Sequence, residues 1–140
     1  MASPSKRKGT GWESAKCEWW QAQGFEGAHR IALHGSNDCG DVFITKTQRG
    51  DVIEECKNTK RLAVPEWLRQ SENERDNAGA WLCLLSWKLV GVGMADPGRH
   101  PVTMRGDDAA KVLAYIAELE AKATRLEAEN AQLKERRYYV

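Results

Sequence analysis

Residues 41–56 of the 140-residue chain read DVFITKTQRGDVIEEC, two β-prone runs on either side of a polar turn. The runs at residues 41–45 and 52–56 are rich in Val, Ile, Phe and Thr, and Gly50 stands in the turn between them. β-Branched and aromatic residues favour strands, and glycine in a short polar connection favours a hairpin. We therefore expect this pair of strands to form the centre of a sheet.

The residues before this hairpin predict a helix and a short strand. Apolar residues recur at mostly helical spacing over residues 12–23, and Gly24 marks the expected end of that helix. Residues 29–33 are predicted to form a strand, and residues 34–40, HGSNDCG, a loop dense in turn formers. Residues 1–11 contain Pro, Ser, Gly and Lys with little to bury, so they are predicted to form a mobile basic arm.

The residues after the hairpin predict a helix and two more strands. Pro65 is expected to begin a helix that runs to Ala78, with Trp67 and Leu68 as a narrow apolar stripe. Its charged residues Glu72, Glu74 and Arg75 are expected to face water. Residues 80–87, AWLCLLSW, are typical of a strand covered on both faces, and residues 101–104 of a shorter one. The fold class is therefore α/β, a mixed sheet flanked by helices.

The C-terminal residues 107–137 carry a seven-residue repeat. One apolar position of the repeat holds Val112, Leu119, Leu126 and Leu133, and the other holds Ile116, Ala123 and Asn130. This pattern predicts a long helix that pairs with a second copy as a parallel two-stranded coiled coil, in which Asn130 faces its twin. The alternative is a single amphipathic helix packed on the domain. The predicted organisation is thus an arm at 1–11, a core domain at 12–106 and a helix at 107–140.

Composition excludes several classes of protein. The formal net charge is +1, so any nucleic-acid partner must be held by local basic runs. The four cysteines are widely separated and show no Cys-x-x-Cys pair, which argues against a zinc site and indicates free thiols. The chain shows neither an apolar run long enough for a membrane span nor a signal-peptide apolar region. We expect an intracellular protein with no membrane partner.

The hairpin also places three chemically active residues near one another. Side chains alternate along a strand, so Glu55 and Lys57 project to the same side, and the hairpin partner brings Asp41 close. Two converging carboxylates suit a hard cation such as Mg²⁺, which keeps several waters and binds phosphate. Lys57 then lies beside the attacking water, where it orients that water or helps to deprotonate it.

These residues occur with others in an order that resembles a known family. Trp12-Glu13-Ser14-Ala15, His34-Gly35-Ser36-Asn37-Asp38, Gly40-Asp41-Val42 and Glu55-Cys56-Lys57-Asn58 are similar to motifs of archaeal-type and phage Holliday junction resolvases. The resemblance covers about residues 8–104. It implies the restriction-endonuclease-like fold of the PD-(D/E)xK nucleases and a Mg²⁺-dependent DNA endonuclease, with Mn²⁺ as a substitute metal.

The resemblance also implies roles for individual residues. Asp41 and Glu55 ligate the metal, the Cys56 carbonyl completes the site, Lys57 serves the water, and Glu13 assists from the first helix. Ser36 corresponds to the family's phosphate-contacting serine. We expect further DNA contacts from basic and polar residues near the site, namely Lys8, Asn58, Lys60 and Arg61.

Glu54 departs from the family pattern, which has an apolar residue at this buried position. A buried unpaired carboxylate costs several kcal/mol. Glu54 therefore has a basic partner, lies near the sheet edge, or reveals an error in the alignment. If Glu54 were the ligand instead of Glu55, Lys57 would fall on the opposite face.

Several conspicuous residues have structural explanations that we favour over functional ones. The six tryptophans are expected to pack in the core, although Trp12 and an exposed Trp67 are candidates for DNA contact. His29, His34 and His100 lack ligand spacing, and His34 is expected to be an exposed loop residue. Asp38 is expected to form an Asx turn.

Three functions remain open on sequence grounds. The preferred one is resolution of Holliday junctions or other branched DNA by a homodimer, in the cytoplasm of a bacterial host if the gene is phage-borne. A second is a duplex-nicking, restriction or repair nuclease of the same fold. A third is a non-catalytic dimeric DNA-binding or scaffold protein, against which the acidic residues Asp107 and Asp108 count.

Overall fold

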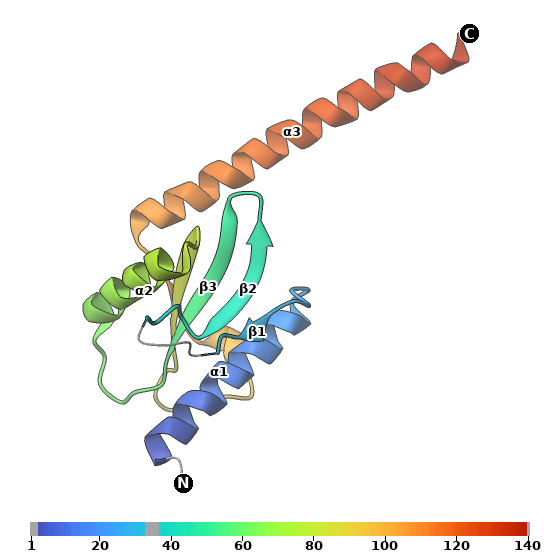
Figure 1. Cartoon of the computed structure of the whole chain (residues 1–140). Coiled ribbons are helices and arrows are strands. Elements are labelled where there is room, and N and C mark those ends of the chain that lie inside the picture. Colours follow the sequence, from blue (N-terminus) through green and yellow to red (C-terminus); the bar gives the residue numbers. More distant parts are fainter. Residues whose placement is uncertain (1–2, 33–36, 140) are drawn as a thin grey trace. The chain divides into compact units, whose positions relative to one another are not determined.

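The computed structural model describes residues 3–32 and 37–139, apart from the side chain of Ser5. The chain divides into two compact units, Met1–Met104 and Arg105–Val140. The first unit contains the sheet with helices α1 and α2, and the second consists of helix α3 (Figure 1).

The first unit is an α/β domain built on a mixed sheet, as predicted. Over the described residues the sheet has five strands in the order β1 (His29–Arg30), β2 (Val42–Thr47), β3 (Gly50–Lys57), β4 (Leu82–Trp87) and β5 (Val102–Thr103). β3 pairs with β4 in parallel, and the other neighbours are antiparallel. β3 is therefore the central strand, with a neighbour on each edge along its length.

The predicted hairpin is confirmed as β2 and β3. Thr47 pairs with Gly50, and Gln48 and Arg49 form the turn between them. Gly50 has a positive φ of 130°, and a Cβ there would lie 3.1 Å from the Cβ of Trp81. Glycine is required at this position because both the backbone conformation and the close approach of Trp81 exclude a side chain.

Helix α1 spans Pro4–Ala22, so it begins before residue 12, where the sequence predicts its start, and includes residues 4–11 of the predicted arm. The Ser3 hydroxyl accepts a hydrogen bond from the Lys6 amide at 3.3 Å, and Pro4 occupies the first turn. Serine as N-cap and proline directly after it form a helix-start pattern that the polar composition concealed. The helix ends before Gly24, as predicted, and Gly24 has a φ of 101°.

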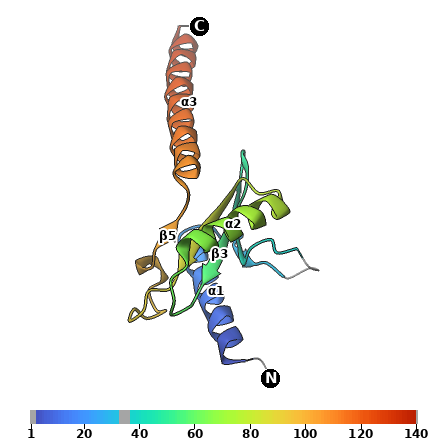
Figure 2. The same cartoon turned by 90° about the vertical axis from the view of Figure 1, so that its left-hand side faces the viewer.

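Helix α2 spans Val64–Ala78 and leads into β4 (Figure 2). Its buried residues are Trp67, Ser71 and Glu74, which lie four and then three positions apart and so share one face. The prediction that Glu74 faces water is therefore wrong, because it lies on the same stripe as Trp67. The apolar run of β4 is buried on both faces as predicted.

The remaining elements are short. β1 is limited to His29–Arg30 within the described residues, and residue 33 of the predicted strand lies outside them. A 3-10 turn at Pro97–Arg99 precedes β5, which matches the strand predicted near residues 101–104. The element order agrees with the sequence prediction.

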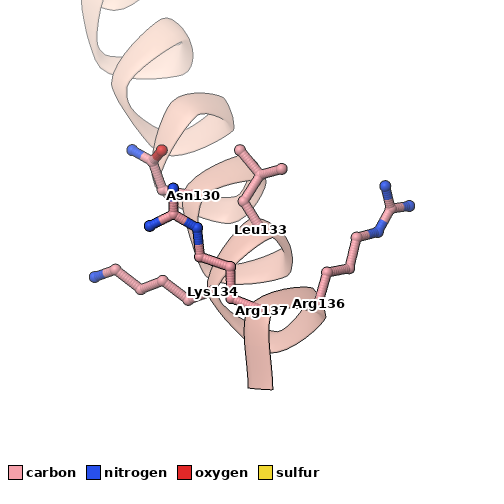
Figure 3. Close-up of a pocket in the computed structure, with 5 residues that line it drawn as sticks. All are labelled: Asn130, Leu133, Lys134, Arg136 and Arg137. Atoms are coloured by element: carbon pink, nitrogen blue, oxygen red, sulfur yellow. The ribbon is translucent and has the colours of Figure 1, made fainter. Parts of the chain in front are cut away.

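Helix α3 spans Gly106–Tyr138, close to the predicted range. The seam residues Ile116, Leu119, Leu126 and Leu133 are 41–57% exposed. Figure 3 shows Asn130 and Leu133 near the end of the helix among the long basic side chains of Lys134, Arg136 and Arg137. Among the helices described, none combines the length and the apolar character needed to cross a membrane.

Candidate functional site

Asp41 immediately precedes β2, opposite the end of β3. Its backbone amide donates to the Glu54 carbonyl at 2.9 Å, and its Oδ2 accepts from the Cys56 amide at 2.8 Å. The preceding Gly40 has a φ of 88°, and a Cβ there would lie 3.3 Å from Ile53 Cδ1. The chain thus turns tightly into β2, and the Asp41 carboxylate is anchored to the backbone of the central strand.

The Cys56 carbonyl is expected to point towards Asp41 as well. In an extended strand the N–H and C=O groups of one residue face the same neighbouring strand. Since the Cys56 amide donates to Asp41, its carbonyl faces the same edge, beyond the first residue of β2. This placement agrees with the predicted role of the carbonyl as a candidate metal ligand.

Glu55 and Lys57 lie on the same face of β3, as the strand alternation predicts. Their side chains form an ion pair, with Glu55 buried and Lys57 partly exposed. Burial alone would lower the pKa of Lys57, but the charges of Glu55, Glu74 and Asp41 raise it overall. Lys57 is therefore held as a cation, which favours orientation of a water and charge stabilisation over proton abstraction.

Glu74 of α2 is a member of this cluster that sequence reasoning missed. It is 4% exposed and shares a hydrogen bond with Glu55. The charges of Asp38, Lys57 and Asp41 also act on it. Its spacing from Trp67 and Ser71 on the buried stripe of α2 is the sequence feature that points to its burial.

The carboxyl groups of the cluster have raised pKa values. Burial and the charge of Glu55 raise the pKa of Asp41 to about 8, against the lowering effect of the Cys56 amide. Burial and the interaction with Glu74 raise the pKa of Glu55 to about 7, and burial raises that of Glu74 to about 7. Crowded acids that hold protons this tightly are characteristic of functional sites.

Glu54 faces the other side of β3 and has a basic partner, which answers the question raised by its position in the sequence. Its Oε1 lies 3.1 Å from Lys16 Nζ, and both side chains are fully buried. Trp20 Nε1 donates to Glu54 Oε2 at 2.9 Å. Glu54 is therefore engaged with α1 and not with the Asp41 cluster, which leaves Glu55 as the carboxylate on that side.

A cleft of about 600 Å³ lies between α1, β1 and the start of β2. Both Glu13 and Asp41 line it, together with the cations Lys6 and Arg30. Glu13 Oε2 lies 2.6 Å from Arg30 Nη2. The structure thus places Glu13 at the same opening as Asp41, but pairs it with an arginine.

Some of the predicted DNA-contacting residues contact one another, and others are exposed in a loop. Asn58 Nδ2 donates to the Lys8 carbonyl at 3.1 Å, which ties the loop after β3 to the first turns of α1. Lys60 and Arg61 are exposed in the loop before α2. Ser36 and His34 lie outside the described residues.

The structural explanations preferred for other residues hold where they can be checked. Trp12 and Trp67 are buried, so core packing is confirmed for both. His100 is buried and accepts from the Leu89 amide at 2.9 Å. Asp38 Oδ1 accepts from the Gly40 amide at 3.2 Å, as expected for an Asx turn.

The donor atoms of the cluster suit a hard divalent cation, although they do not converge. Over residues 3–32 and 37–139, no three His, Cys, Asp or Glu side chains are positioned to hold a metal ion together. However, Glu55 Oε2 and Glu74 Oε2 are buried without a hydrogen-bond partner. Buried carboxylate oxygens that lack donors are suitable ligands for Mg²⁺ or Mn²⁺.

Comparison with known proteins found no matching family model, no similar curated protein and no similar solved structure.

Proposed function

We propose that the chain is a Mg²⁺-dependent DNA endonuclease of the restriction-endonuclease-like type. The observation that carries the proposal is the arrangement of three side chains at the end of β3. Glu55 and Lys57 share one face of the strand, and the Asp41 carboxylate accepts a hydrogen bond from the amide of Cys56, which lies between them. Two carboxylates can hold a metal ion that activates a water for phosphodiester hydrolysis, and a lysine beside them can orient that water.

Each residue has a defined task in this proposal. Asp41, Glu55 and the Cys56 carbonyl would hold Mg²⁺, which lowers the pKa of a bound water and neutralises charge on the phosphate. Lys57, held as a cation, orients the water and stabilises the charge that develops on the phosphate oxygens. Glu13 supports the site from α1, and Arg30 fixes its orientation.

The cleft supports a polyanionic substrate. Lys6 and Arg30 line it beside the carboxylates, so a phosphate backbone that enters the cleft meets cations as well as the acidic centre. Lys8, Lys60 and Arg61 are exposed and available for further phosphate contacts. The motif order that resembles Holliday junction resolvases makes branched DNA the preferred substrate.

The test compares cleavage of labelled four-way junction, duplex and single-stranded DNA, with Mg²⁺, Mn²⁺, Ca²⁺ or chelator. Junction cutting in Mg²⁺ and Mn²⁺ is expected, with binding but no cutting in Ca²⁺, which orders the attacking water poorly. Asp41→Asn, Glu55→Gln and Lys57→Ala should each lower the rate at least about a hundredfold. Glu13→Gln should have a smaller effect.

The exposed Glu66→Gln on α2 is a matched control and should retain full activity. Equal cutting of duplex and junction would favour the alternative of a duplex-nicking, restriction or repair nuclease of the same fold. DNA binding without cutting in any metal would favour the non-catalytic DNA-binding alternative and exclude the nuclease proposal.

We also propose that α3 joins two copies of the chain as a parallel coiled coil. Its apolar seam is about half exposed, and a paired seam would bury it. In a parallel pair Lys122 faces Glu127 of the partner, and Glu129 faces Lys134 of the partner, so both flanking contacts are attractive. Asn130 lies on the seam beside Leu133 and would meet its twin (Figure 3).

Light scattering of the full chain tests this assembly. The unmodified chain should be a dimer at micromolar concentration, and Leu126→Glu should make it monomeric. Ala128→Glu introduces the same side chain on the outer face of α3 and should leave the dimer intact. A monomeric unmodified chain, or a dimer that survives Leu126→Glu, excludes pairing through this seam.

A further inference from the structure

Glu74 is a buried acid without an adequate partner. It lies on the inner stripe of α2, where Trp67 and Ser71 are its buried neighbours, and it is 4% exposed. Glutamate is rarely buried unless it is paired, because desolvation of the charged group costs several kcal/mol. A leucine or methionine at this position would pack without that cost.

The surroundings of Glu74 offset its burial only in part, because the hydrogen bond with Glu55 and the charge of Lys57 do not outweigh desolvation. Its hydrogen-bonding neighbour is Glu55, another acid, and the nearby Lys57 forms its ion pair with Glu55. Glu74 Oε2 has no hydrogen-bond donor, and neither does Glu55 Oε2. Two buried carboxylate oxygens from two different elements are thus left without partners in one cluster.

A divalent cation is the partner whose chemistry fits these oxygens. Mg²⁺ and Mn²⁺ take oxygen ligands, and one cation offsets the repulsion between several carboxylates at once. Asp41 acts electrostatically on both Glu55 and Glu74, so the three acids belong to a single charge cluster. A proton shared between two glutamates removes only part of this repulsion.

We propose that Glu74 is a third carboxylate of the divalent-cation site, contributed by α2 beside Asp41 and Glu55 of the β2–β3 hairpin. The inference rests on the proposed nuclease function, which requires the cation, and it adds a residue from outside the motifs on which that function is based. It assigns Glu74 to binding of the metal, directly or through a metal-bound water.

Titration of the full chain with Mn²⁺ alone, followed by calorimetry or by water proton relaxation, tests the inference without any activity measurement. Glu74→Gln is expected to weaken Mn²⁺ binding at least about tenfold, on the scale of losing a supporting carboxylate. Glu74→Asp should restore part of the affinity, because it keeps the carboxylate. Glu66→Gln, on the exposed side of the same helix, should bind as the unmodified chain does.

Thermal denaturation in chelator separates this role from a structural one. Glu74→Gln should melt at or above the temperature of the unmodified chain, because it relieves repulsion between buried acids. A Glu74→Gln variant that is destabilised and still binds Mn²⁺ with full affinity would show that Glu74 is structural and overturn the inference.

Asp41→Asn distinguishes this failure from failure of the proposed function. If Asp41→Asn loses Mn²⁺ affinity while Glu74→Gln keeps it, the metal site stands and only the assignment of Glu74 falls. If the unmodified chain binds no Mn²⁺, both fail.

Discussion

Glu54 and Glu55 are neighbours on the central strand, yet the two faces of the sheet treat them differently. On the α1 face, Glu54 is fully buried against Lys16 and accepts from Trp20. On the α2 face, Glu55 meets Lys57 but also the buried acid Glu74, and Asp41 lies nearby. One carboxylate has a cation and an indole donor that compensate part of the burial that raises its pKa, whereas the other is crowded by like charges.

The contrast separates a structural acid from a candidate functional one. Lys16 lies over three indole rings, 5.9 Å from the Trp12 centroid, 4.7 Å from Trp19 and 5.1 Å from Trp20. The pair it forms with Glu54 is thus enclosed and inaccessible to a substrate. The Glu55 face gathers three carboxyl groups around the cation Lys57, and their raised pKa values show that their ionised forms are disfavoured unless a further cation is bound.

The largest effect on stability is expected from removal of the Lys16–Glu54 ion pair on the α1 face. Lys16→Met leaves the Glu54 carboxylate buried without a cation and should lower the free energy of unfolding by about 3–5 kcal/mol. Urea denaturation at pH 7 measures the change. Lys46→Met, on an exposed position of β2, should be nearly neutral.

Adding Glu54→Gln to Lys16→Met should recover most of the loss, because Gln still accepts from Trp20 and carries no charge. An unchanged unfolding midpoint in Lys16→Met alone would mean that the pair does not compensate Glu54.

An intermediate effect is expected from Trp20→Phe, which removes the indole donor to Glu54 Oε2. Hydrogen bonds to charged groups contribute about 1.5–3 kcal/mol, so a loss of this size in the free energy of unfolding is predicted. Trp87→Phe, at a half-buried position at the end of β4, reports the cost of the smaller ring. Equal losses in the two variants would show that the bond to Glu54 contributes little.

The smallest effect on stability, and one of opposite sign, is expected from removal of the Glu55 charge on the α2 face. The pKa of Glu55 rises to about 7 in the folded chain from an ordinary value of about 4.3. The folded state therefore binds the proton more tightly, and the stability this contributes is present below about pH 4 and lost as the pH rises through about 7. Asp41 and Glu74 act in the same direction.

In chelator, the melting temperature of the unmodified chain should thus fall between pH 5 and pH 8. Glu55→Gln should make this fall shallower and raise the melting temperature at pH 8, because it removes the buried charge that the raised pKa of Glu55 reflects. The accompanying loss of the ion pair with Lys57 should keep the gain small. Glu66→Gln should leave the profile unchanged. A rise in melting temperature towards pH 8 in the unmodified chain would contradict the predicted crowding.

The sequence predicted the hairpin, the apolar strand and the Glu55–Lys57 face because these depend on local periodicity. It did not predict the partner of Glu54, since Lys16 lies on a helix 38 positions away and only the packing of α1 on β3 brings the two together. Glu74 was missed for a similar reason, because burial of α2 depends on the sheet. The start of α1 was missed because composition was weighed above the Ser3-Pro4 cap.

The two-residue turn at Gln48 and Arg49 has a consequence for the order of folding. Hairpins form in about 1–10 μs, whereas the parallel pairing of β3 with β4 must wait for the crossover through α2. The hydrogen bond from the Cys56 amide to Asp41 spans only 15 positions and belongs to the hairpin. The folding chain is therefore expected to bring Asp41, Glu55 and Lys57 together before α2 docks. Glu74 would arrive last, so that a cation present during folding would meet an incomplete set of carboxylates and favour the docking of the helix that completes it.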